Sequence, residues 1–191
     1  YPEYKAFPQH FPRGDLGVDS RHKVRAWAIY DLVQAEHHNL SVSWLERYQS
    51  GTPYGARGDV ASEVFLDNPG YLTPPSDVDY WYTDRDAFTT DDIHSSNLTF
   101  IYAFGWKMFG KELEVFVQPQ VLNVFDEHGQ VRVNTSVVEA TNSSDYADFD
   151  PFTETPVEGV NFDFGEDFGR ALREEDFQQP RTYRFSVGFR F

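Results

Sequence analysis

Cysteine is absent from this chain of 191 residues, and methionine occurs only once. Without cysteine there is no disulfide framework, no thiolate zinc site and no cysteine nucleophile. Long apolar runs are also missing: the best is the seven-residue stretch 100–106, whereas a membrane-spanning helix needs roughly 20 residues. These absences exclude a disulfide-stabilised scaffold, a cysteine-dependent enzyme and a helical membrane protein.

Basic residues are scarce in two long segments. Residues 50–96 carry 9 acidic and 2 basic side chains, and residues 125–180 carry 14 acidic and 3 basic ones. The rest of the chain is slightly basic, so the formal net charge of −15 belongs to these two segments. Acidic loops repel phosphate groups, and we therefore expect no nucleic-acid partner.

Aromatic residues are abundant: 18 Phe, 11 Tyr and 4 Trp make up 17% of the chain. Such side chains favour the pleated surface of a sheet. Apolar and polar residues alternate with period two in five segments, namely 23–32, 39–48, 97–106, 112–123 and 181–191. The pattern predicts an all-β fold. Pro119 lacks an N–H group, so a bulge or a local break is expected there.

The connections between these segments alternate in length. The first and second, and the third and fourth, are joined by short turns, whereas 50–96 and 125–180 are long. Long structureless loops are uncommon in compact domains but normal on the outer side of a transmembrane β-barrel. We expect a local hairpin or helix turn inside them, around 59–67 or 169–176, without placing it.

A barrel strand presents one face to lipid and the other to a polar lumen. In the last segment the lipid face is predicted to run from Tyr183 to Phe191 on alternate residues. Trp106 and Tyr48 suit the aromatic girdles at the two membrane interfaces. The charged residues predicted to face the lumen are Arg25, Arg47, Glu112, Glu114, Arg184 and Arg190. Among them, Glu112 and Glu114 are expected to pair with Arg184 or Arg190.

The sequence resembles the C-terminal end of TonB-dependent outer-membrane receptors, closest to their Oar-like branch. The resemblance rests on "SGTPYG" at 50–55, "LNVFDE" at 122–127 and the closing strand ending in Phe191. It implies the C-terminal strands of a 22-stranded transmembrane antiparallel barrel in the Gram-negative outer membrane, importing a scarce or large nutrient of the siderophore, oligosaccharide or peptide class. Phe191 then matches the family's signal to the barrel-assembly machinery.

What the resemblance implies goes beyond this chain. Five strands cannot close such a barrel, and neither the plug domain nor a TonB-contacting segment is among these residues. We therefore expect a fragment of a longer receptor, or a chain that pairs with another carrying the rest of the barrel and the plug. Its other expected partners are membrane lipid, lipopolysaccharide and, through the plug, TonB.

The acidic stretch 144–169 is a candidate metal site, because carboxylate oxygens suit calcium. Its candidate ligands are Asp145, Asp148, Asp150, Asp163 and Asp167. No EF-hand spacing is present, and a solvated acidic loop is the favoured interpretation. The aromatic residues between these acids are expected to pack the loop, with ligand contact as the alternative.

No catalytic or cofactor motif occurs, so the predicted role is binding and transport without an enzymatic activity. Two alternatives stay open. One is a passive porin or an adhesion barrel, which would share strands and loops. The other is a soluble secreted β-domain, such as a sandwich that binds cations or glycans, because its strands alternate in the same way.

Overall fold

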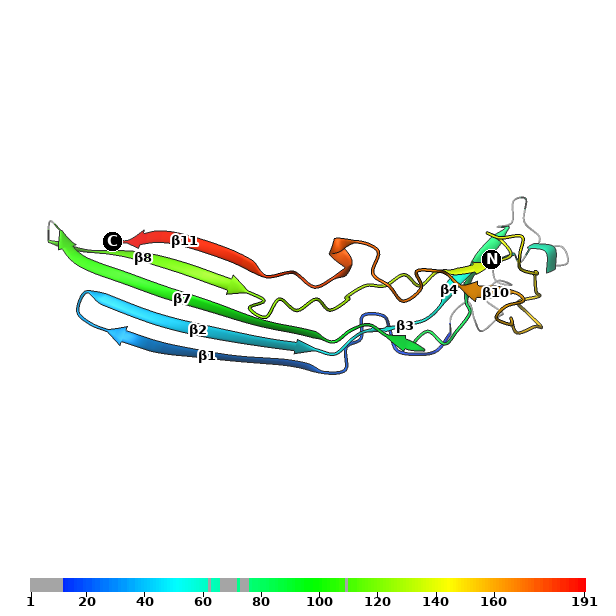
Figure 1. The fold of residues 1–191 in the computed structure, drawn as a ribbon, viewed down its shortest axis with the longest axis horizontal. Helices are drawn as coiled ribbons and strands as arrows, with labels where there is room; N and C mark the ends of the chain where they lie inside the picture. Colours follow the sequence, from blue (N-terminus) through cyan, green and yellow to red (C-terminus); the bar gives the residue numbers. More distant parts are fainter. Residues whose placement is uncertain (1–11, 62, 66–71, 73–75, 109) are drawn as a thin grey trace. The chain divides into compact units, whose positions relative to one another are not determined.

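The computed structural model describes residues 12–61, 63–65, 72, 76–108 and 110–191, with the backbone alone at 108, 111 and 112. Its largest element is a five-stranded antiparallel sheet (Figure 1). The strand order is β1 (Lys23–Gln34), β2 (His38–Gln49), β7 (Ile93–Met108), β8 (Lys111–Leu122) and β11 (Thr182–Arg190). The sheet confirms the predicted all-β class, and each of the five predicted segments overlaps one of these strands.

Short turns join two pairs of neighbouring strands. Between β1 and β2 the Ala35 N–H donates a hydrogen bond to the carbonyl of His38 at 2.9 Å. Between β7 and β8 lies Gly110, whose φ of 76° is a backbone conformation that glycine adopts without a steric penalty. β7 begins at Ile93, before the predicted start at residue 97, because Ile93 continues the ladder opposite Gln49 of β2.

Two irregularities interrupt the ladders. Pro119 pairs with Phe185 of β11, but the pairing of β8 with β7 lacks partners for Phe100 and Ile101, next to the proline. The predicted break is therefore present on the β7 side, and the register on either side of it is the same. A shift between Asp31 and Val33 of β1 marks the second irregularity.

The chain divides into two compact units. The sheet unit comprises 20–51, 91–131 and 177–191, and the loop unit comprises the described residues of 1–19, 52–90 and 132–176. The two long connections thus contribute to one folded body. The alternation pattern predicts a single barrel segment with two separate loops and does not indicate that the loops fold together.

The described residues of the loop unit form three two-stranded sheets and two 3-10 turns. The strand pairs are β3 (Pro53–Tyr54) with β6 (Phe88–Thr89), β4 (Arg57–Ala61) with β5 (Asp77–Trp81), and β9 (Val137–Glu139) with β10 (Phe162–Phe164). The turns are η3 (Glu63–Phe65) and η4 (Glu174–Asp176), which lie in the two segments where local structure was expected.

Candidate functional site

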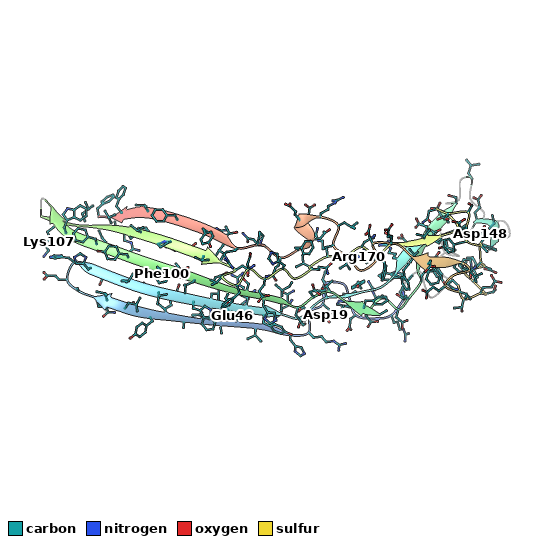
Figure 2. All side chains as sticks on the ribbon, in the orientation of Figure 1. Asp19, Glu46, Phe100, Lys107, Asp148 and Arg170 are labelled. Carbon is teal, nitrogen blue, oxygen red and sulfur yellow. The ribbon has the colours of Figure 1, made fainter. Side chains whose placement is uncertain are left out.

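The two faces of the five-stranded sheet differ in chemistry. Register aligns side chains of one kind in rows that cross the strands. One row contains Tyr30, Val42, Phe100, Pro119 and Phe185, and two further rows contain Trp44, Leu98, Val121 and Tyr183, and Leu40, Tyr102, Val117 and Val187. We call this side the apolar face; Phe100 is labelled on it in Figure 2.

The apolar face is not a buried core. Phe185 is 69% exposed and Phe189 is 67% exposed, and Tyr30 and Tyr183 are exposed to a similar degree. Among the described residues of the sheet, Ala103 is the one apolar side chain that is buried. A layer of protein over these rings would be needed if the sheet were half of a sandwich, and the described residues of the sheet unit do not supply one.

Toward the start of β7, polar side chains replace the apolar ones, and the apolar face ends there. Glu46 of β2 accepts a hydrogen bond from the hydroxyl of Ser96, its partner in the ladder. Beyond that row, the rings of Tyr48 and His94 lie 4.9 Å apart, and the Tyr48 hydroxyl donates to Asp92 at 2.9 Å. At the other end of β7, the rings of Phe104 and Trp106 lie 5.5 Å apart.

The opposite side, which we call the polar face, carries the residues predicted to face the lumen. One of its rows contains Ser43, Thr99, Gln120 and Arg184. Arg190 donates a hydrogen bond to Glu114 at 2.9 Å, which confirms an expected ion pair, and its guanidinium lies 5.0 Å from the ring centre of Phe116. Glu112 pairs with Lys107 in the register, but its side chain lies outside the described residues.

Positive charge gathers on the polar face where β1 and β11 begin and β2 ends. We call this set, Lys23, Arg25, Arg47 and Arg184, the cationic end. Lys23, Arg25 and Arg47 line a pocket of about 270 Å³, and Arg47 and Arg184 line a second of about 260 Å³. No Asp or Glu lines either pocket, and among the described residues the structure gives none of these four side chains a carboxylate partner.

Buried amides hold the backbone around the cationic end. Asn123 is 3% exposed; its amide donates to the carbonyls of Glu127 and Gln179 at 2.9 Å, and its side-chain oxygen accepts from the Glu127 N–H at 3.0 Å. The Gln178 amide donates to the carbonyl of His94 at 2.9 Å. Neither role is among those predicted from the sequence, although an Asn directly after an alternating run is a signal of a turn.

The other end of the polar face is acidic. Asp31, Glu36 and Glu114 line a pocket of about 550 Å³ together with Arg190. The Gln34 amide donates to Asp31 at 2.7 Å, so two of the acids on this wall already have donors. Along its strands the polar face therefore changes from basic at the cationic end to mixed charge at the other end, where Lys107 and Arg190 accompany the acids.

Aromatic side chains form the core of the loop unit. One cluster joins Val60, Tyr80 and Phe149, and a second joins Ala56, Val137 and Phe162. Phe152, Phe164 and Phe168 pack against these clusters. The prediction that phenylalanines pack the acidic loop is confirmed for these residues. The two clusters also connect residues 52–90 to residues 132–176.

Burial and hydrogen bonding shift the pKa of three groups in the loop unit and of Asp92 in the sheet unit. Burial raises the pKa of Tyr80 to about 12 and raises that of Tyr82 further. Burial, followed by the charge of Asp79 across the ladder, raises the pKa of Asp59. Hydrogen bonds from the Gly51 N–H and the Tyr48 hydroxyl lower the pKa of Asp92.

The candidate calcium ligands serve local turns. Asp150 accepts hydrogen bonds from the Phe152 N–H at 2.9 Å and the Thr153 hydroxyl at 2.7 Å. Asp163 accepts from the Phe164 N–H, Asp167 lies 3.9 Å from Arg170, and the Asp145 N–H donates to Ser143. Within the described part of the chain, no three acidic or histidine side chains, Asp148 included, come together as a metal cluster.

Comparisons with family models, with curated proteins and with solved structures find no match to this chain. In the part of the chain that the structure describes, no helix is both long enough and apolar enough to span a membrane.

Proposed function

We propose that this chain forms part of the wall and outer loops of a TonB-dependent transporter of the Gram-negative outer membrane, which binds a scarce or large nutrient and imports it. The exposed apolar face carries the proposal. Rings such as Phe185 and Phe189 would be strongly unfavourable in water at this density, whereas hydrocarbon is their natural solvent.

The dimensions of the apolar face fit a bilayer. From Leu98 to Trp106 the strand rises roughly 27 Å at about 3.4 Å per residue. A tilt near 40° reduces this to roughly 21 Å, close to the apolar band of about 25 Å on known barrels. The polar groups at Glu46 and Ser96 then fall at an interface, beside the aromatic rings of Tyr48 and His94.

The sheet edges require further strands. β1 and β11 occupy the two ends of the strand order, so each presents a row of backbone groups without a ladder partner. In lipid such groups have no hydrogen-bonding solvent, and only a closed barrel satisfies them. We infer that strands from the same or another chain complete the barrel, that a plug fills it, and that Phe191 serves as the assembly signal.

The loop unit supports a preformed outer mouth. Its aromatic clusters join residues 52–90 to residues 132–176, so the two long connections are held as one body. A folded mouth loses less conformational entropy on binding than two free loops would.

The proposal can be tested with single cysteines, because the chain has none of its own. Two matched pairs of neighbours are Phe185→Cys with Ser186→Cys, and Val42→Cys with Ser43→Cys. We expect a charged maleimide to label the cysteines at 186 and 43, and a fluorophore at 185 and 42 to be quenched by spin-labelled lipid. Equal labelling by the charged reagent at both members of each pair would overturn the membrane assignment.

Two further measurements separate the alternatives. A soluble secreted β-domain is extracted in buffer, whereas a barrel requires detergent. A passive porin admits its solute after the inner-membrane proton gradient is collapsed, whereas uptake by a TonB-dependent transporter stops. Uptake that continues unchanged would replace the transporter proposal with the porin.

A further inference from the structure

We propose that the cationic end of the polar face binds the carboxylate groups of a small polycarboxylic acid. The inference rests on the proposed function and deepens it, because it names the chemical class of the ligand that the wall accepts. It is carried by two observations: uncompensated positive charge and two adjoining pockets.

The positive charge at this end is uncompensated. Arg25 and Arg47 are direct partners in the β1–β2 ladder, an arrangement in which like charges repel. The chain has a net charge of −15, yet neither pocket at this end is lined by an acid. An anion placed here would relieve the repulsion and gain charge-assisted hydrogen bonds.

The side chains favour a carboxylate ligand with more than one anionic group. The guanidinium group presents its N–H donors as a planar fork that matches a carboxylate. The two pockets share Arg47, Ser95 and Gln179, and Arg25 and Arg184 lie in different ones. A molecule that spans both pockets can therefore place separate carboxylates against separate arginines.

The experiment uses the protein purified in detergent at low salt, with citrate as the probe and acetate, which carries one carboxylate, as its control. Titration calorimetry is expected to show citrate binding that weakens as sodium chloride is added. Acetate should bind at least about tenfold more weakly, because one carboxylate cannot reach arginines in both pockets. Equal affinity for the two acids would overturn the assignment of separate carboxylates to separate arginines.

Two variants test the arginines. Arg47→Gln and Arg184→Gln should each weaken citrate binding about tenfold or more, because each removes charge-assisted hydrogen bonds. Arg190→Gln is the matched control on the same face: Arg190 already has Glu114 as its partner, so citrate affinity should stay within about twofold. Unchanged affinity in Arg47→Gln and Arg184→Gln, or no citrate binding to the unaltered protein, would overturn the proposal.

Failure of this inference and failure of the proposed function give different results. If cysteine labelling alternates as expected but citrate does not bind, the membrane wall stands and the polycarboxylate site falls. If citrate binds through Arg47 and Arg184 but labelling does not alternate, the site stands and the transporter falls.

Discussion

The side-chain amide of Asn123 donates a hydrogen bond to the carbonyl oxygen of Gln179 at 2.9 Å, joining the end of β8 to the segment that leads into β11. Asn123 also has a φ of 51°, in the left-handed region that asparagine tolerates better than most residues. One residue therefore ends a strand, closes the turn to Glu127 and aligns the last strand with its neighbour.

Replacing Asn123 should destabilise the sheet unit. Asn123→Ala leaves backbone groups of Glu127 and Gln179 without partners. It also places alanine, which tolerates the left-handed region less well than asparagine, at a positive φ. We therefore expect urea unfolding to show a loss of about 3 kcal/mol in the free energy of unfolding. Asn123→Gly is the control, since it removes the same hydrogen bonds but relieves the backbone; it should lose roughly 1 kcal/mol less. Equal losses would show that the backbone conformation contributes nothing.

Two strand glycines on the polar face should respond oppositely to alanine. A Cβ at Gly188 would overlap the ring of Phe116, its partner in the β8–β11 ladder, whereas a Cβ at Gly105 meets nothing within 4 Å. Gly188→Ala should lower the unfolding free energy by about 1–2 kcal/mol through overpacking. Gly105→Ala should be neutral or slightly stabilising. A comparison of urea midpoints checks both, and equal shifts would contradict the contact.

The aromatic core should determine the order of the loop unit. Phe149 is 5% exposed, and its ring meets that of Tyr80 edge-on at 5.3 Å. Phe149→Ala should destabilise the unit by about 3–5 kcal/mol and speed cleavage within the loops by added protease. Phe125→Ala removes a ring that is 70% exposed, so it should leave cleavage unchanged. Equal cleavage of both variants would mean that Phe149 does not hold the loops together.

Sequence alone predicts the strands because alternation is a local property, readable in a single segment. It places Arg25 and Arg47 on the polar face for the same reason. It cannot show that Arg184 lines a pocket with Arg47, because that depends on the register of three successive strand pairs, from β2 to β11. The loop core is harder still, since Tyr80 and Phe149 are far apart in the chain and each lies in an acidic, turn-rich segment.

Asp59 should make the loop unit more stable in acid than near neutrality. Burial and the facing charge of Asp79 raise its pKa above the usual 3.8, so the folded state holds the proton more tightly than the unfolded chain does. The resulting stabilisation is complete below about pH 4 and is lost as the pH rises through the raised pKa. Asp59→Asn should remove this dependence, because the amide carries no charge at either end of the range.

The measurement is the rate of amide hydrogen exchange in β4 and β5, corrected for intrinsic exchange, at pH 4 and pH 7. We expect Asp59→Asn to slow exchange relative to the unaltered protein at pH 7 and to match it near pH 4. Asp167→Asn, a change at an exposed carboxylate of the same unit, should leave the difference between the two pH values as it was. If the unaltered protein exchanges no faster at pH 7 than at pH 4, the prediction is wrong and the repulsion between Asp59 and Asp79 does not lower the stability of the loop unit. The physical reason would then be the ion pair of Arg57 with Asp79, at 2.5 Å, which offsets the charge of Asp79.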